Sequence, residues 1–110
     1  MDELEISPKD LQVLLLGEEP PLLLDCREPV EHGICRIEPS TLMPMNTIPE
    51  NLAKLEALAE EREIVVYCHH GVRSLNTAAW LRRQGVERVR SLRGGIERWS
   101  VEIDPQVPRY

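Results

Sequence analysis

The sequence predicts an α/β fold in which a small, mostly parallel sheet is flanked by helices on both faces. Two short apolar runs, residues 22–26 and 64–67, are bounded by turn residues, so we expect both to be buried strands. Segments with helical periodicity or helix-capping residues lie between and after these runs. Strands that alternate with helices favour parallel pairing. The 110 residues can enclose one hydrophobic core, and we expect a single domain over residues 1–110.

The first element is predicted to be a helix that begins after Ser7. Serine is a good helix cap, Pro8 fits the first turn, and Gly17 would end the helix. A turn then leads into the apolar strand at residues 22–26. Residues 28–32 are expected to form a single further helical turn.

The middle of the chain is predicted to be irregular at first and then helical. Two prolines interrupt any regular pattern within residues 33–46. Thr47 and Glu50 have the spacing of a capping box and predict the start of a helix. One face of that helix carries four apolar side chains: Leu52, Leu55, Leu58 and Ala59. The second apolar strand follows and ends directly before Cys68.

The last third of the chain predicts two helices and a third strand. A helix over residues 74–84 contains Trp80, and alternating side chains over residues 88–92 predict the strand. The glycine pair at residues 94–95 is expected to form a tight turn into a short helix that contains Trp99. Both tryptophans have apolar neighbours at helical spacing and are assigned to the core.

Charge is unevenly distributed along the chain, whose formal net charge is −6. Residues 1–63 carry fifteen acidic and five basic side chains, whereas residues 64–110 carry four acidic side chains and eight arginines. Clustered positive charge can attract anions to a site, although these arginines can equally be solvated helix faces. The overall acidity and the lack of a basic run argue against a nucleic-acid partner.

Composition also limits the location and the kind of site. No apolar run approaches the ~20 residues needed to span a bilayer, and the acidic, polar N-terminus does not resemble a secretory signal. We therefore expect a cytoplasmic protein with no membrane partner. The three cysteines include no CxxC pair, so they predict neither a disulfide framework nor a metal site. We expect no bound cofactor.

Cys68 is the strongest candidate for chemistry. It would leave the strand at residues 64–67 and open a compact loop that closes at Arg73, where a helix starts. Backbone N–H groups of such a loop can form a nest for anions, the helix N-terminus adds partial positive charge, and Arg73 adds a full charge. These features predict a Cys68 pKa of ~3.5–7.5, below the ordinary value of about 8.5. The alternative is a buried, inert cysteine at a strand end.

The residues around Cys68 are the candidates for substrate binding. We assign this role to His69, His70, Gly71 and Val72 in the loop and to Ser74 after it. Gly71 permits the positive φ that a tight loop needs, and the amides of the loop are expected to point inward while its side chains point outward. The two histidines could alternatively be metal ligands or proton donors, and we favour polar loop residues for both.

Three segments together resemble the rhodanese family of sulfurtransferases in its single-domain form. The six residues from Cys68 to Arg73, followed by Ser74, are similar to the cysteine loop of that family. Residues 24–28 resemble its strand-end D-x-R-E element, and residues 92–99 resemble its C-terminal L-x-G-G element. The stretch after D-x-R-E differs, because Gly33 is not followed by the family's histidine. This difference concerns one wall of the expected site and not the cysteine.

The resemblance implies a rhodanese-like fold and a two-step transfer of sulfur. The Cys68 thiolate would attack the outer sulfur of a small anionic donor such as thiosulfate, and sulfite would leave. Loop amides would stabilise the resulting persulfide, and Arg73 would orient the donor. Cyanide, or a small-molecule or protein thiol, would then remove the sulfur. The scheme uses no metal.

Residues outside the loop receive supporting or structural assignments. Asp25 and Arg27 are expected to support the loop as an ion pair or hydrogen-bonded pair, with substrate contact as the alternative. Cys26 is assigned to the core, and alternatively it could resolve a Cys68 persulfide as a disulfide. Cys35, in the irregular stretch, is expected to be exposed and open to oxidation. Tyr110 is expected to be no more than a chain terminus.

Two other functions remain open. The first is a cysteine-based phosphatase or arsenate reductase; such enzymes resemble this site but use a loop one residue longer, so the six-residue spacing favours sulfur. The second is a non-catalytic or sulfur-carrier module, because a small and shallow site would suit the handing of a persulfide to a partner protein.

Overall fold

The computed structural model of the chain describes residues 3–110. Within those residues, five strands form one sheet in the order β1-β5-β4-β2-β3, and every pairing is parallel. The strands are β1 (Glu5–Ile6), β2 (Leu22–Asp25), β3 (Thr41–Leu42), β4 (Ile64–Tyr67) and β5 (Val89–Leu92). The predicted α/β class is therefore confirmed, and the sheet is parallel throughout the described part of the chain.

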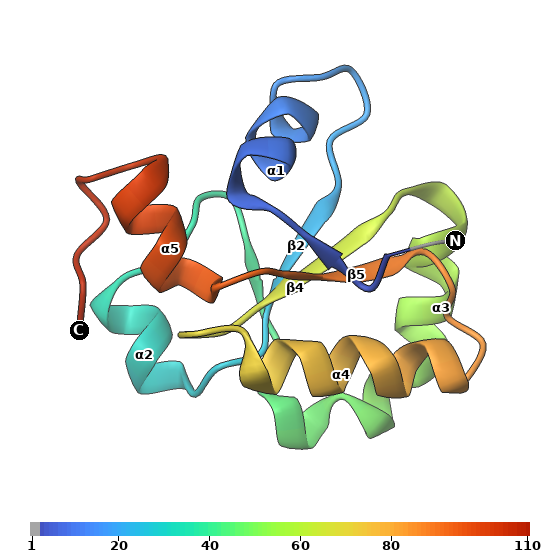
Figure 1. Ribbon diagram of the computed structural model, residues 1–110. Coiled ribbons are helices and arrows are strands. Elements are labelled where there is room, and N and C mark those ends of the chain that lie inside the picture. The colour runs from blue at the N-terminus through green and yellow to red at the C-terminus, as the bar shows by residue number, and fades with distance from the viewer. Residues whose placement is uncertain (1–2) are drawn as a thin grey trace.

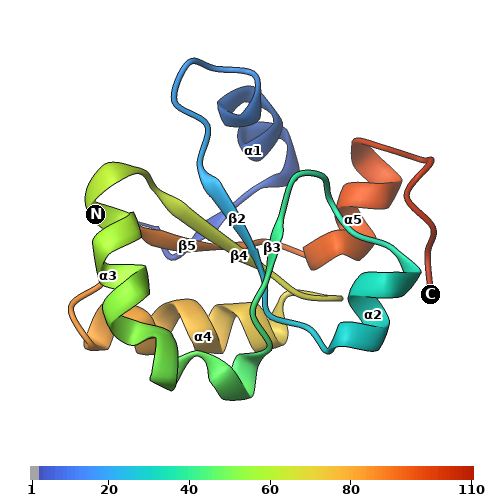
Figure 2. The same cartoon turned by 180° about the vertical axis from the view of Figure 1, so that it is seen from behind.

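Helices cover both faces of the sheet. They are α1 (Pro8–Leu15), α2 (Pro29–Ile34), α3 (Leu52–Glu61), α4 (Val72–Arg83) and α5 (Gly95–Glu102). In Figures 1 and 2, α1 and α5 lie on one side of the sheet and α3 and α4 on the other. Two 3-10 turns, Met45–Thr47 and Pro49–Asn51, lead into α3. Across residues 3–110, none of the helices has the length and apolar character needed to cross a membrane.

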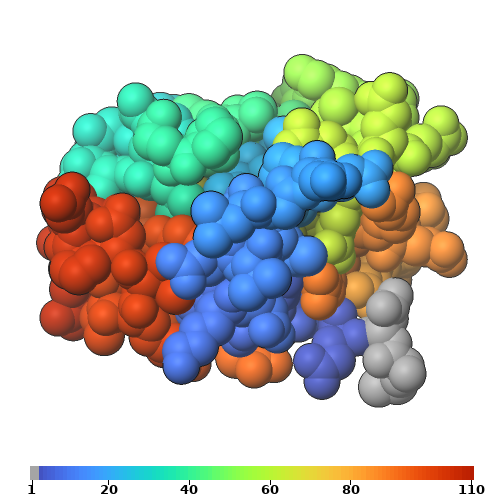
Figure 3. Space-filling model, turned by 90° about the horizontal axis from the view of Figure 1, so that it is seen from above, coloured from blue at the N-terminus to red at the C-terminus, as the bar shows by residue number. Residues whose placement is uncertain are grey.

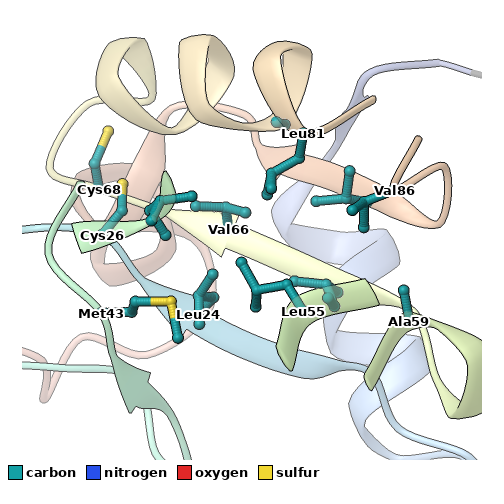
Figure 4. Packing of buried hydrophobic residues seen from close by; sticks show 13 residues of the cluster. Leu24, Cys26, Met43, Leu55, Ala59, Val66, Cys68, Leu81 and Val86 are labelled. Atoms are coloured by element: carbon teal, nitrogen blue, oxygen red, sulfur yellow. The ribbon is translucent and has the colours of Figure 1, made fainter. Parts of the chain in front are cut away.

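Each face of the sheet has its own buried cluster, because successive side chains of a strand point to opposite faces. On the α3/α4 side, Leu24 and Val66 from the central strands pack with Leu55 and Leu81 (Figure 4). On the α1/α5 side, Val65 belongs to a second cluster that includes residues of both helices. Burial on both faces explains why the central strands are unbroken apolar runs in the sequence.

Two helices begin at positions other than the predicted ones. Helix α4 starts two residues early, because Gly71 has a φ of 99° and already caps it. Thr47 and Glu50 do not form the predicted capping box. Instead, Thr47 Oγ1 donates to the Pro44 carbonyl at 2.8 Å, and the 3-10 turns delay the start of α3 to Leu52.

The two edge strands, β1 and β3, were not predicted from the sequence. Each has only two residues, which is too short for a periodic pattern, and β3 lies in the stretch expected to be irregular. The cap of the first helix is confirmed, since Ser7 Oγ accepts a hydrogen bond from the Asp10 N–H at 3.1 Å. Trp99 is buried in the core as predicted, whereas Trp80 is only half-buried.

The segment after α5 turns back along the molecule and packs beside the region that contains α2 (Figure 3). Ser100 Oγ donates to the Val107 carbonyl at 2.6 Å, which fastens this segment to α5. At its end, the Tyr110 hydroxyl donates to Glu31 in α2 at 2.7 Å. The prediction that Tyr110 is a mere terminus is therefore wrong.

Candidate functional site

Cys68 follows β4 directly and lies within a tight loop. The backbone N–H groups of Gly71 and Ser74 donate to its Sγ, with N–S distances of 3.1 and 3.3 Å. Ser74 Oγ lies 3.4 Å from the same sulfur and contacts Ser91 Oγ at 2.7 Å. The amides thus point at the sulfur in the way that an anion-binding nest requires.

The carbonyl groups of the loop point elsewhere, toward the first turn of α5. The Ile96 N–H donates to the Cys68 carbonyl at 2.9 Å, and the Glu97 N–H donates to the His69 carbonyl at 3.1 Å. Gly95 allows this close approach, because a Cβ there would lie only 2.4 Å from the His69 oxygen and 2.5 Å from the Cys68 oxygen. Gly95, the first residue of α5, therefore helps to hold the loop with its carbonyl groups away from the sulfur.

Hydrogen bonds to the sulfur stabilise the thiolate form of Cys68. A hydrogen bond with the Cys26 thiol, together with those from the Ser74 hydroxyl and from the Ser74 and Gly71 amides, lowers the pKa of Cys68 to about 5, although burial opposes the shift. The same hydrogen bond with Cys68, reinforced by burial, raises the pKa of Cys26. At neutral pH this arrangement favours a thiolate on Cys68 beside a protonated thiol on Cys26.

Burial of the sulfur is the main departure from the expected site. Only 1% of Cys68 is exposed to solvent, so the shallow site that would suit a carrier module is wrong for this conformation. A buried cysteine was the expected mark of an inert residue, whereas the inward amides were the expected mark of a reactive one. The structure combines both features, and any reagent that reaches Cys68 must displace neighbouring side chains.

Arg73 is the second residue of α4 and is paired with a carboxylate. Its NH1 and NH2 groups donate to the two oxygens of Glu31, at 2.8 and 2.9 Å. This bidentate contact is the main reason that the pKa of Glu31 falls to about 2, and the Tyr110 hydroxyl contributes in the same direction. About a third of the Arg73 side chain, 34%, stays exposed. Sequence reasoning did not find Glu31, because its partner is 42 residues away.

Asp25 and Arg27 form the predicted ion pair, and both side chains are fully buried. Arg27 Nε and NH2 each donate to one carboxylate oxygen of Asp25 at 2.8 Å, and His32 Nδ1 lies 2.7 Å from Asp25 Oδ2. A further Arg27 nitrogen donates to the Tyr110 hydroxyl at 2.8 Å. The pair thus connects to the Glu31–Arg73 contact through Tyr110 and supports the site without touching the sulfur.

Cys35 does not have the predicted exposure. It is 7% exposed and belongs to the cluster on the α1/α5 side of the sheet. Its carbonyl accepts a hydrogen bond from Arg27 NH2 at 2.7 Å, which holds the stretch after α2 against the buried ion pair. A local pattern that lacks regular structure therefore gave a wrong prediction of exposure.

The remaining predicted binding residues lie on the outer side of the loop. His69 is stacked between the rings of His70 and Tyr110, with centroid distances of 4.0 and 3.9 Å. Burial lowers the pKa of His69, and its Nε2 is buried without a hydrogen-bond partner among the described residues. His70 and Val72 are exposed. His70 and Tyr110, with Glu97 and Arg109, line a hollow on this surface.

The structure of residues 3–110 contains no group of three or more histidine, cysteine or acidic side chains placed to hold a metal ion. The three cysteines are free thiols. Ser91, whose hydroxyl supports Ser74, was not singled out from the sequence. A serine inside the predicted strand at residues 88–92 is the signal that could have been noticed. In the structure its side chain is fully buried, and a buried polar group needs a partner.

Comparison with known proteins gives consistent matches. A family model described as the rhodanese-like domain matches residues 7–102. A sulfurtransferase of Allochromatium vinosum is 36% identical over 96 residues, which is 87% of this chain and 87% of that protein. A rhodanese-related protein from Thermoplasma volcanium has a crystal structure with a TM-score of 0.81 and 28% identity, covering 98% of this chain and 100% of that one.

One of the similar proteins is much longer. The probable adenylyltransferase/sulfurtransferase MoeZ of Mycobacterium tuberculosis is 35% identical over 107 residues, which is 96% of this chain. This chain spans only 26% of the length of MoeZ.

Proposed function

The chain belongs to the rhodanese-like domain family, and on that premise we propose that it is a thiosulfate-type sulfurtransferase that works through a persulfide on Cys68. The donor is a small anion that carries a sulfane sulfur, such as thiosulfate or a persulfide. The acceptor is a small thiol, a protein thiol or cyanide. Cys68 and Arg73 act on the donor, and His69, His70, Gly71, Val72 and Ser74 surround it.

In the first step, the Cys68 thiolate attacks the outer sulfur of thiosulfate. The sulfur–sulfur bond of the donor breaks, and sulfite departs with the electron pair. The persulfide that remains on Cys68 carries a negative charge on its outer sulfur. In the second step, the acceptor attacks this outer sulfur, and the Cys68 thiolate leaves.

The observation that carries this proposal is the pair of backbone N–H groups aimed at Cys68 Sγ, from Gly71 at 3.1 Å and Ser74 at 3.3 Å. These amides are fixed by the loop and by the start of α4, so they need no rearrangement to stabilise a thiolate. A thiolate is the nucleophilic form of cysteine and the better leaving group, so the same amides serve both steps.

Arg73 is proposed to attract the anionic donor to the loop. A guanidinium binds oxyanions well, and Glu31 holds this one in a fixed position. Because Cys68 is 1% exposed, the donor also needs an opening. We place that opening at Tyr110, whose ring stacks on His69 while 39% of the residue is exposed.

A protein acceptor and a reducing compartment complete the proposal. MoeZ is named as both an adenylyltransferase and a sulfurtransferase, so the similar region occurs there in a chain with a second named activity, and we propose a protein acceptor for the sulfur of this chain as well. A cytoplasmic location is proposed because three free thiols suit a reducing environment.

Mass spectrometry of the intact protein after exposure to thiosulfate tests the proposal. We expect sulfite to appear in solution and one sulfur atom to be added to Cys68, as located by digestion under non-reducing conditions. Cys68→Ser should gain no sulfur and should keep the same circular dichroism spectrum as the parent. A Cys68→Ser variant that still transfers sulfur would contradict the mechanism. So would a parent protein that releases no sulfite from thiosulfate and no thiol from a low-molecular-weight persulfide, and gains no sulfur on Cys68 from either donor.

A further inference from the structure

Cys26 and Cys68 follow two neighbouring parallel strands at the same edge of the sheet. The register of β2 and β4 pairs Asp25 with Tyr67, and the Cys26 N–H continues the ladder by donating to the Tyr67 carbonyl at 3.1 Å. The next residues along the two strands are Cys26 and Cys68. Adjacent strands lie about 4.8 Å apart, and disulfides join Cα atoms about 4.4–6.8 Å apart. The backbone thus places the two cysteines at a distance that a disulfide can bridge.

The two side chains also point to the same face. Cys26 alternates with Leu24 and Cys68 with Val66, and all four belong to the buried cluster on the α3/α4 side. Figure 4 shows both cysteines at the same end of this cluster. Both are 1% exposed, so each is the other's most accessible sulfur partner. The third cysteine, Cys35, belongs to the cluster on the opposite face.

The thiol of Cys26 is held for proton transfer to its neighbour. Its interaction with Cys68, reinforced by burial, raises the pKa of Cys26, so Cys26 stays protonated while Cys68 is a thiolate. A protonated thiol is a poor nucleophile until a base takes its proton. The outer sulfur of a persulfide on Cys68 is an anion, and it would arrive directly beside this thiol.

We propose that Cys26 is a resolving cysteine that discharges a Cys68 persulfide as sulfide when no acceptor arrives. This inference rests on the function proposed above. The Cys26 proton passes to the outer sulfur, and the Cys26 sulfur attacks Cys68 Sγ. The bond between Cys68 Sγ and the outer sulfur breaks, and the outer sulfur leaves as hydrosulfide with the electron pair. The outer sulfur is reduced and the Cys26 sulfur is oxidised, so no further oxidant is needed.

The product is a Cys26–Cys68 disulfide that blocks the nucleophile. An external thiol such as glutathione restores it by two thiol–disulfide exchanges, in which the external thiol is oxidised. Through this step the protein would release sulfide when acceptors are scarce. The disulfide would also protect Cys68 from irreversible oxidation.

The test uses the reduced, desalted full chain with thiosulfate and no acceptor. Parent, Cys26→Ala, Cys26→Ser and Cys35→Ala proteins are compared by sulfite release, sulfide release and non-reducing mass spectrometry. In the parent and in Cys35→Ala, we expect about one sulfide per chain and a Cys26–Cys68 cross-linked peptide that has lost two hydrogen atoms. Both Cys26 variants should still release sulfite and gain sulfur on Cys68, although more slowly in Cys26→Ala because the pKa of Cys68 rises there. The sulfide released per persulfide formed should fall about tenfold or more in both variants.

The outcomes separate the two proposals. A parent protein that releases sulfite and keeps its persulfide, with no cross-linked peptide, would overturn the role of Cys26 and leave the sulfurtransferase intact. Equal sulfide release from the parent and both Cys26 variants would do the same. Failure of all four proteins to release sulfite would overturn the sulfurtransferase and, with it, the resolving step.

Discussion

At the edge of the sheet where the candidate site lies, the two faces carry different kinds of side chain. On the α3/α4 side, the sulfurs of Cys68 and Cys26 belong to an apolar cluster. The polar contacts of Cys68 Sγ among the described residues are with backbone amides and a hydroxyl, and no charged side chain is among them. On the α1/α5 side, full charges gather in the buried ion pair of Asp25 and Arg27. The comparison indicates that hydrogen bonds tune the sulfur, while charges hold the surrounding structure in place.

Arg73 illustrates this difference between the hydrogen bonds that tune the sulfur and the charges that hold the structure. The sequence suggested that its positive charge would act on Cys68, but Glu31 neutralises it through two short hydrogen bonds. The largest influences that lower the pKa of Cys68 are hydrogen bonds instead. Tyr110 joins the regions, since its hydroxyl contacts Arg27 and Glu31 while its ring stacks on His69.

The largest expected effect comes from breaking the buried ion pair of Asp25 and Arg27. Asp25→Ala leaves Arg27 as a buried charge without its carboxylate, and we expect a loss of about 3–5 kcal/mol in the free energy of unfolding, measured with urea. The matched control is Glu102→Ala, which breaks the exposed Arg98–Glu102 pair and should cost less than about 1 kcal/mol. Equal losses in the two variants would show that the buried pair has no special structural role.

The next effect separates the action of Arg73 on the donor from action on the sulfur. Arg73→Ala should raise the KM for thiosulfate by about tenfold, because a charge-assisted contact with the anion is lost. The pKa of Cys68 should change little, since its main hydrogen bonds stay in place. Steady-state kinetics and a thiolate titration measure the two quantities. A large rise in the pKa of Cys68 with an unchanged KM for thiosulfate would show instead that Arg73 acts on the sulfur and not on the donor.

The smallest expected effect concerns Tyr110, which contacts both the cysteine loop and the charged residues Arg27 and Glu31. Tyr110→Ala removes both the stacking on His69 and the hydroxyl contacts, and it should raise the rate of Cys68 alkylation by about three- to tenfold through local opening. Tyr110→Phe keeps the stacking and loses only the hydroxyl contacts with Arg27 and Glu31, so its rate should lie between those of the parent and Tyr110→Ala. Identical alkylation rates in all three proteins would place the route to the sulfur elsewhere.

Sequence and structure agree where the signal is local. The central strands, the Ser7 cap, the turn at Gly71 and the Asp25–Arg27 pair all follow from residues close together in the chain. The six-residue spacing from Cys68 to Arg73 is local in the same sense, and it led to the family now shown by comparison.

The missed features depend on distance or on tertiary packing. Tyr110 and Glu31 are 79 residues apart, and no pattern in the chain pairs them. The two-residue edge strands exist only through their neighbours. Cys35 is buried by packing with residues distant in the chain, and its carbonyl accepts a hydrogen bond from Arg27. The burial of Cys68 likewise follows from packing and could not be read from the loop itself.

The most direct measurement is a pH titration of the Cys68 thiolate by its ultraviolet absorbance, with Cys68→Ser as the blank and Cys35→Ala as the control background. We expect a midpoint near pH 5, with the thiolate present above it and lost as the pH falls below it. In Cys26→Ala the midpoint should move to higher pH, because the strongest hydrogen bond that lowers it is removed. A midpoint at the ordinary value for a cysteine, about 8.5, in the otherwise unmodified protein would contradict the amide-stabilised thiolate on which the mechanism depends.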